Sequence, residues 1–295
     1  MTFIESLPDS TWLDAEPQSA PVPQPIEISV VLPCLNEETA VAECVASIKE
    51  VLDALGKSYE VIVADNGSTD ASVQRAGAAG ARVVHESVPG YGSACRAGLR
   101  AAHGRFVLWG DADGTYDFTS SPDLIALLEE GADVALGNRL TGDLEPGSMP
   151  WTHRRLGTPF LTGVVNVLFG AEIGDVNCGI RAISRGAYLK LDPQATGMEF
   201  ASELLVKAIQ NDLTIAQIPV PYRLRSGGEV KLRTFSDGWR HLRLVVRTWL
   251  SQGRRVSAPA PLVVFAGNSD VTIDLRKAGE PDEDRVRLRH RLPRD

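Results

Sequence analysis

Between residues 28 and 138 the chain alternates short apolar runs with longer amphipathic ones, and this alternation restricts the possible folds more than any other feature. The apolar runs have the length of strands: ISVVLP, YEVIVAD, ARVVHE, RFVLWGDAD and ADVALGNR. Segments with helical periodicity separate them, such as EETAVAECVASIKEVLDAL and YGSACRAGLRAAHG. Strands that alternate with helices at this spacing build a parallel sheet covered by helices. We therefore predict an α/β fold, with a Rossmann-like, mostly parallel sheet and helices on both faces.

The two ends of the chain differ from this central part. Residues 1–25 are rich in proline and acidic side chains, so we expect an extension without ordered structure. They have neither the basic start nor the long apolar stretch of a signal peptide. We divide the rest into one large domain of residues 26–235, a basic amphipathic helix of residues 236–253, and a C-terminal tail of low order, residues 254–295. No apolar run approaches the roughly 20 residues that span a bilayer.

The charges and cysteines indicate where such a chain works. A net charge of −8 argues against binding to nucleic acid, although residues 222–255 contain nine Lys or Arg and only two Asp or Glu. None of the four cysteines forms a CxxC pair, which is typical of a protein in a reducing compartment. We therefore expect a cytoplasmic protein with one strongly basic segment near its C-terminus.

Polar side chains follow four of the predicted strands at the point where each strand ends. The segments are PCLNEE, ADNGSTD, GDADGTYD and GNR. Turns and helix caps would account for each of them separately. In a parallel sheet, however, ligands bind beyond the carboxyl ends of the strands, and all four segments would meet there. Their shared position predicts one ligand site at this edge.

The third of these segments contains two aspartates that are suited to a metal ion. Asp111 and Asp113 flank a single residue, so an extended backbone would point both carboxylates to the same side. Two like charges this close are costly unless a cation lies between them. Mg²⁺ and Mn²⁺ prefer oxygen ligands and commonly hold a substrate diphosphate. GYGSAC, residues 90–95, resembles a dinucleotide-binding fingerprint, but it follows the third strand instead of the first, which disfavours NAD.

Seven segments, in order, resemble glycosyltransferase family 2, in the branch of dolichol-phosphate (polyprenyl-phosphate) mannosyl- and glucosyltransferases. They are VVLPCLNEE, VIVADNGSTD, GDADGTYDF, GNR, DVNCGIRA, GMEFASELLVKA and KLRTFSDGWRHLR, and they extend from about residue 28 to residue 250. The resemblance implies a GT-A catalytic domain in residues 26–235 and a nucleotide-diphosphate sugar as donor. It also implies Mg²⁺ or Mn²⁺ and inversion at the anomeric carbon during transfer of a hexose to a polyprenyl phosphate.

The same resemblance implies roles on the donor side. Asp65 would bind the base, and the residues along the nucleoside would be Pro33, Asn36 and Glu37. Asp111 would face the ribose and the metal, while Asp113 would ligate the metal and the diphosphate. Asn66 stands where many members have a second aspartate, so a charged role at this position is not expected.

On the acceptor side, the resemblance implies a set of groups that bind phosphate, namely Arg139, Arg154, Arg155, Asn177, Lys231 and Arg233. The residues implied in catalysis are Asp113, Arg139, Asp175 and Glu203. Asp175, Asn177 and Gly179 match the D-x-x-x-G loop of the family. Glu199 and Glu203 are four residues apart, so a helix would place them on one face.

The basic segment has the pattern of a helix at a membrane surface. At 100° per residue, Arg240, Arg243 and Arg247 fall within an arc of about 60°. The adjoining arc holds apolar side chains, namely Trp239, Leu242, Val246, Trp249 and Leu250. A basic amphipathic helix with tryptophans can lie on an anionic membrane. We therefore predict peripheral membrane contact through residues 236–250, although many relatives continue into hydrophobic segments where this chain turns polar.

Three alternatives remain open from the sequence. The same transfer could use a soluble small-molecule acceptor, and a hydroxyl acceptor would then need a base, for which Asp175, Glu199 and Glu203 are candidates. A sugar-1-phosphate nucleotidyltransferase has a similar sheet, but CLNEE is acidic where that class carries a glycine-rich basic loop. A binding module without catalysis is disfavoured because both aspartates of the DxD motif are present.

Overall fold

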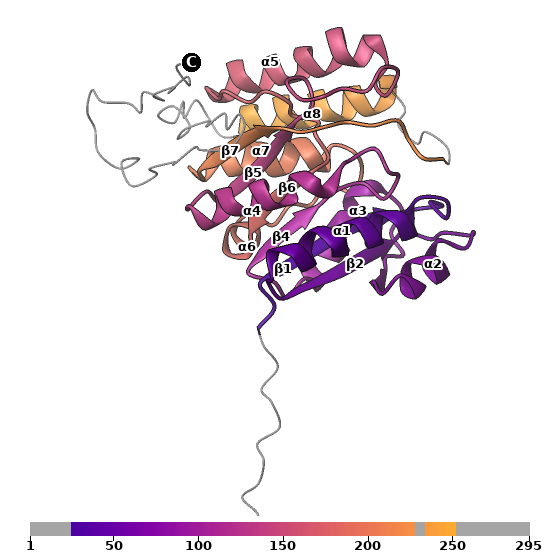
Figure 1. Cartoon of the computed structure of the whole chain (residues 1–295). Helices are drawn as coiled ribbons and strands as arrows, with labels where there is room; N and C mark the ends of the chain where they lie inside the picture. The colour runs from indigo at the N-terminus through magenta and orange to yellow at the C-terminus, as the bar shows by residue number, and fades with distance from the viewer. Residues whose placement is uncertain (1–24, 228–233, 252–295) are drawn as a thin grey trace, which may run out of the picture.

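The computed structural model describes residues 25–227 and 234–251 of the chain (Figure 1). Their centre is a seven-stranded sheet with the order β3-β2-β1-β4-β6-β5-β7. The strands are β1 (Ile28–Cys34), β2 (Tyr59–Asp65), β3 (Arg82–His85), β4 (Phe106–Trp109), β5 (Val134–Asn138), β6 (Arg181–Ser184) and β7 (Ile215–Pro219). The mostly parallel sheet confirms the predicted fold class, and the first five strands are those predicted from the apolar runs.

One strand of the sheet runs against the others. β6 lies between β4 and β5 and is antiparallel to both, whereas β5 and β7 are parallel to each other. β6 has only four residues, and so short a run carries no sequence signal for its direction. Its insertion separates β4 from β5 and brings the loop that precedes it to the ends of both strands.

Helices cover both faces of the sheet. α1 (Val41–Leu55), α2 (Ser72–Ala78) and α4 (Ser121–Glu129) lie on one face. The opposite face carries α3 (Tyr91–Ala101), α6 (Arg185–Leu191) and α7 (Phe200–Gln210). Every residue of β1 and of β5 is buried, because these strands are covered on both sides.

Two further helices lie beside each other at one end of the sheet. α5 (Thr158–Phe169) packs against both α7 and α8 (Thr234–Ser251), as Figure 1 shows. A π-helical turn, η2 (His153–Gly157), leads directly into α5. α8 is attached to α7 by Ser202 and the buried His241, whose Oγ and Nδ1 atoms lie 2.7 Å apart. Among the described residues, none of the helices is long and apolar enough to cross a membrane.

Candidate functional site

The strand order of the sheet reverses at β1 and β4, and we use the word crevice for the region beyond the carboxyl ends of these two strands. β2 and β3 lie on one side of β1, and β4 lies on the other. Ligands of open α/β sheets bind outside the carboxyl ends of the strands. Glu37 follows β1, and Asp111 and Asp113 follow β4, so the predicted donor-binding loops do meet at this edge.

The two aspartates of the DxD motif have different surroundings. Asp113 accepts hydrogen bonds from the Thr115 backbone at 3.0 Å and hydroxyl at 2.6 Å, and its second oxygen contacts a guanidinium. Oδ1 of Asp111 is buried and has no hydrogen-bond partner. Burial, followed by the charge of Asp113, raises the pKa of Asp111 to about 7. A cation between the two carboxylates would relieve both effects.

The pair fits a divalent ion that is shared with a substrate. Among the described residues, no group of three or more His, Cys, Asp or Glu side chains is arranged to hold a metal. Mg²⁺, however, is usually bound through one or two carboxylates together with substrate phosphates and water. Asp111 and Asp113 supply these two carboxylates, and the partnerless Oδ1 of Asp111 is the atom that a metal would satisfy.

Sequence reasoning did not single out Arg225, which contacts the DxD motif directly. Its guanidinium donates to Asp113 Oδ2 at 2.7 Å and forms an ion pair with Glu37. The segment 222–227, which we call the strap, lies along the DxD loop through backbone bonds from Arg223 to Thr115 and from Ser226 to Asp113. The excess of basic residues after position 222 was the available signal, but it did not indicate which arginine turns inward.

The residues predicted along the nucleoside connect the loops after β1 and β2. Pro33 is a buried residue of β1. Asn36, with φ of 51°, accepts from the Thr69 backbone at 2.8 Å. Asp65 is buried at the end of β2, where it accepts from Ser68 and His85 at 3.1 and 3.2 Å. Burial favours a raised pKa for Asp65, but these hydrogen bonds outweigh it, and the pKa is lowered.

The next residue, Asn66, makes hydrogen bonds that an aspartate could not make. Its amide nitrogen donates to the carbonyls of Glu86 and Val88 at 2.9 and 2.8 Å, and its oxygen accepts from Gly90 N at 2.6 Å. A carboxylate has no hydrogen to donate to the two carbonyls. Asn66 therefore fixes the loop before α3, which accounts for the departure from the family's usual aspartate.

The glycines of GYGSAC are explained by packing. A Cβ atom on Gly90 would lie 2.1 Å from the carbonyl oxygen of Thr196, and one on Gly92 would lie 2.4 Å from that of Ala195. Gly90 also has a φ of 134°, which side chains rarely adopt. The start of α3 thus requires glycine because the loop 195–197 lies against it, and no dinucleotide is needed to account for the motif.

Arg139 and Asp175 were predicted as separate groups, and the structure joins them in one buried ion pair. Arg139 donates through Nε at 2.7 Å and through a terminal nitrogen at 2.9 Å to the two oxygens of Asp175, which is fully buried. Burial opposes the charge of Arg139, but Asp175 outweighs it and raises the pKa of the guanidinium. The guanidinium also lies 5.2 Å from the ring centre of Tyr222 in the strap.

The D-x-x-x-G loop lies against the DxD motif. Asn177 donates its backbone N–H to Asp175 at 3.1 Å, while its side-chain oxygen is buried without a hydrogen-bond partner. Gly179 donates to the hydroxyl of Tyr116 at 2.6 Å. A Cβ atom on Gly179 would lie 2.8 Å from Asp111 Oδ2, so glycine is needed where this loop approaches Asp111.

The two glutamates near the start of α7 are engaged elsewhere, which does not support the predicted catalytic role of Glu203. Glu203 accepts backbone N–H groups of Gln194 and Ala195 at 2.6 to 2.9 Å and pairs with Lys207. Glu199 immediately precedes the helix and pairs with Arg240 of α8 at 2.8 Å. Both carboxylates thus hold neighbouring segments in place. The predicted phosphate-binding residues Lys231 and Arg233 lie outside the described residues.

The remaining predicted phosphate-binding arginines lie on η2. Arg154 and Arg155 are exposed there. Burial, followed by the charge of Arg139, lowers the pKa of His153, so His153 lies within electrostatic range of Arg139. π-helical turns are rare and are found frequently at functional sites. The candidate site therefore combines the acidic groups of the DxD motif with Arg139, and two exposed arginines lie on η2.

Comparisons with known proteins give a family match and several relatives of this chain. The sequence model of glycosyl transferase family 2 matches residues 29–191. The low-salt glycan biosynthesis hexosyltransferase Agl6 of Haloferax volcanii is 41% identical over 239 residues, which are 81% of this chain and 56% of Agl6. The chain thus spans little more than half the length of that relative. The dolichyl-phosphate hexose transferase of the same organism is 32% identical, over 78% of this chain and 97% of the relative.

A solved structure shares the fold. Glucosyl-3-phosphoglycerate synthase from Mycobacterium tuberculosis, in complex with Mn²⁺, UDP-glucose and phosphoglyceric acid, superimposes with a TM-score of 0.61 at 27% identity. The match covers 77% of this chain and 80% of that one. Its likeness supports the GT-A fold for the described residues.

Proposed function

This chain belongs to glycosyltransferase family 2, and from that premise we propose that it transfers a hexose from a nucleotide-diphosphate sugar to the phosphate of a polyprenyl phosphate. The observation that carries the proposal is the state of the carboxylates near the crevice. Both oxygens of Asp175 and of Glu203 are engaged by a cation or by backbone N–H groups, and Glu199 pairs with Arg240 through Oε1, while its Oε2 is buried without a hydrogen-bond partner. A hydroxyl acceptor needs a base, whereas a phosphate acceptor is already an anion at neutral pH.

The donor is proposed to bind at the DxD side of the crevice. Asp111 and Asp113 would hold Mg²⁺ or Mn²⁺, which when bound would neutralise the charge of the departing diphosphate. Arg225 lies within reach of the same carboxylates and can contribute a second positive group. Asp65, at the end of the neighbouring strand, is proposed to bind the base. The Mn²⁺ and UDP-glucose in the structure of glucosyl-3-phosphoglycerate synthase support this assignment.

The acceptor phosphate is proposed to bind on the arginine side. Arg139 is fixed by Asp175 and can present its remaining N–H groups, while Arg154 and Arg155 are exposed on the adjacent turn. Planar guanidinium groups suit phosphate. Asp175 then serves as a positioning residue for Arg139. This role takes the place of the base that the sequence analysis considered for Asp175. The similarity to a dolichyl-phosphate hexose transferase supports this class of acceptor.

The chemistry proposed is a single displacement. An oxygen of the acceptor phosphate forms a bond to the anomeric carbon while the bond from that carbon to the diphosphate breaks, and the electron pair leaves with the nucleoside diphosphate. The configuration inverts because attack and departure occur on opposite faces. No proton has to move, so the residues of this chain bind and orient the two anions and stabilise the charge on the leaving group.

Matched acceptors test the proposal. Transfer from UDP-, GDP- and TDP-hexoses is measured with Mg²⁺, Mn²⁺ or EDTA, using either a polyprenyl phosphate or the polyprenol of the same chain length. We expect a product with the phosphate only, and none in EDTA. NMR of the product then gives the anomeric configuration. Equal transfer to the polyprenol would contradict the phosphate as nucleophile.

A second candidate keeps the donor site but uses a small phosphorylated acceptor in water. It is favoured by the bound phosphoglyceric acid in the structurally similar synthase. The arginines beside the crevice would serve either phosphate. A water-soluble phosphate ester that competes with the polyprenyl phosphate, and is itself glycosylated faster, would favour this candidate.

A further inference from the structure

Exposed apolar side chains are concentrated on α5, α8 and the turn before α5. Seven of the ten large exposed apolar residues in the described chain lie within 151–169 and 234–251. On α5, Phe160 is 62% and Val167 is 83% exposed, while on α8 Trp239 is 65% and Leu250 is 66% exposed. Single exposed apolar residues are normal, but a group on two neighbouring helices marks an interaction surface. We call this surface the α5–α8 face.

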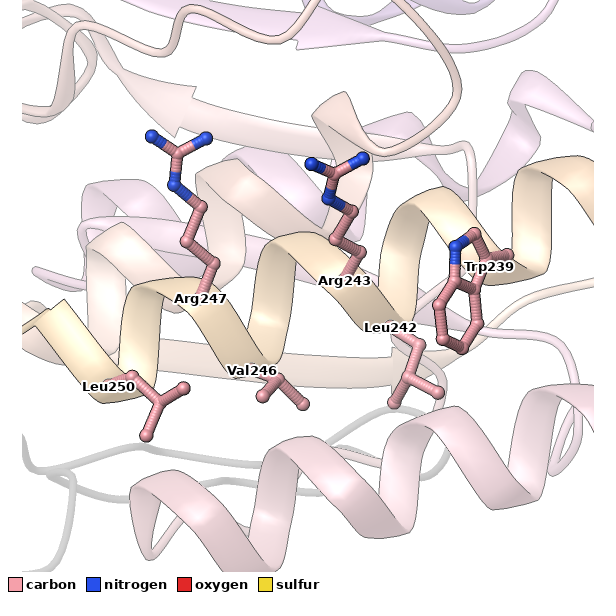
Figure 2. A pocket seen from close by; sticks show the side chains of 6 residues that line it. All are labelled: Trp239, Leu242, Arg243, Val246, Arg247 and Leu250. Carbon is pink, nitrogen blue, oxygen red and sulfur yellow. The ribbon is translucent and has the colours of Figure 1, made fainter.

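The side chains of α8 are sorted along its exposed surface. Figure 2 shows Trp239, Leu242, Val246 and Leu250 on the side toward the neighbouring pink helix α5, with Arg243 and Arg247 on the other side. These six residues line an open groove of about 400 Å³. The buried side of the same helix carries His241 and Val245, which attach it to the domain. The exposed side therefore has an apolar strip beside a basic strip.

The charge of the α5–α8 face is opposite to that of the whole protein. Residues 151–169 and 234–251 contain five arginines and one aspartate, while the chain has a net charge of −8. The structure corrects one part of the predicted basic arc, because Arg240 is paired with Glu199 and holds α8 to α7. Four arginines remain for a partner, namely Arg154, Arg155, Arg243 and Arg247.

We propose that the α5–α8 face docks onto an anionic lipid surface, with the apolar strip inserted and the arginines at the headgroups. The combination of inserted Trp, Phe and Leu with flanking arginines fits a bilayer interface. A second copy of the chain fits less well, because a two-fold contact places the same patch of both subunits together and would bring the arginines of both copies close. The inference rests on the proposed function, since docking of this face would bring the arginines of η2 to the headgroup region, where a polyprenyl phosphate carries its phosphate.

Sedimentation with vesicles tests the docking without any catalytic step. The full chain is mixed with vesicles of phosphatidylcholine alone or with added phosphatidylglycerol. The basic variant is Arg243→Gln/Arg247→Gln, and the apolar variant is Phe160→Ser/Trp239→Ser. We expect wild type to bind only the anionic vesicles. Two arginines at about 1 kcal/mol each correspond to about thirtyfold weaker binding, and added salt reduces this difference.

Two control variants lie outside the α5–α8 face. Leu189→Ser on α6 removes a side chain that is 65% exposed, and Arg100→Gln on α3 removes an exposed charge. Both should bind anionic vesicles as wild type does. No binding by wild type, or equal loss in the controls, would overturn the proposal. So would a wild-type dimer in size-exclusion chromatography that the apolar variant converts to a monomer.

Donor hydrolysis, measured in the absence of lipid, separates this inference from the proposed function. Both variants of the α5–α8 face should hydrolyse the donor as wild type does, because neither touches the crevice. Vesicle binding without transfer to polyprenyl phosphate would leave the docking intact and would refute the proposed acceptor. Transfer to detergent-dispersed polyprenyl phosphate without vesicle binding would support the proposed acceptor and would refute the docking.

Discussion

Replacing Asp175 by asparagine should destabilise the protein strongly, and the size of the effect distinguishes a positioning residue from a base. The carboxylate is fully buried and receives four N–H groups: two from the Arg139 side chain at 2.7 and 2.9 Å, and the backbone N–H groups of Arg139 and Asn177 at 3.3 and 3.1 Å. Asp175→Asn keeps the shape but leaves the guanidinium without its counter-charge. Breaking a buried ion pair from one side typically costs about 3–5 kcal/mol.

Urea unfolding followed by circular dichroism measures this cost. With a slope near 3 kcal/mol/M, a loss of about 4 kcal/mol lowers the midpoint by about 1.3 M. The double variant Arg139→Met/Asp175→Asn is the matched control, because it removes both charges and keeps a side-chain oxygen for the backbone N–H groups of residues 139 and 177. It should recover most of the stability, since no buried charge is left without its partner. Neither variant should transfer sugar, because both lose the fixed guanidinium.

A different outcome would refute the reasoning. If Asp175→Asn unfolds within about 1 kcal/mol of wild type but transfers no sugar, the carboxylate is acting on the substrate and the pair contributes little to stability. Asp175 would then be the base of a hydroxyl-directed reaction. Transfer by Asp175→Asn at the wild-type rate would show that Asp175 is neither a base nor a positioning residue for Arg139.

Three further predictions concern the crevice and its support. Asp113→Asn should abolish transfer and metal-dependent nucleotide binding in calorimetry without changing the unfolding midpoint by more than about 0.3 M urea, and full activity in this variant would contradict the metal assignment. Asn66→Asp should lower the free energy of unfolding by about 1–3 kcal/mol, because the carbonyls of Glu86 and Val88 lose their donor. Its thermal midpoint should fall below that of Asn36→Asp, which changes an exposed residue in the same way. A wild-type midpoint for Asn66→Asp would show that Asn66 does not hold the loop before α3. Burial lowers the pKa of His241 to about 4. As the pH falls, this histidine is therefore protonated in the unfolded chain before it is protonated in the folded one, and about 2 kcal/mol of stability is lost between pH 7 and pH 5. Urea unfolding of His241→Asn should lack this part of the pH dependence.

Much of the fold could be predicted because it depends on local periodicity. The apolar runs from residue 28 to residue 138 correspond to β1 to β5, and the amphipathic segments between them correspond to α1 to α4. The pattern after residue 150 was weaker. A four-residue strand such as β6 has no periodicity that reveals its direction, and a π-helical turn such as η2 differs from an α-helix only in its hydrogen bonds.

The candidate site was predictable where a strand ends in a polar loop. Parallel strands place their carboxyl ends at one edge, so the loops with Glu37, Asp65 and the DxD motif were expected to lie together without knowledge of side-chain contacts. Glu203 shows the limit of this reasoning. Its spacing from Glu199 was compatible with a shared task, but the backbone N–H groups of a loop eight and nine residues before it occupy its oxygens.

The sequence by itself determined the layered sheet, the edge at which we expect ligands and the two carboxylates that suit a metal, because each of these follows from periodicity or from spacing within a few residues. Only the tertiary structure decided the partners of the arginines. Arg139 pairs with Asp175 across 36 residues, and Arg225 reaches Asp113 and Glu37 across 112 and 188 residues. These contacts exist because the sheet order brings the loop before β6 and the segment after β7 to the ends of β4 and β1. A local sequence pattern does not show which distant charges the folded chain will bring together.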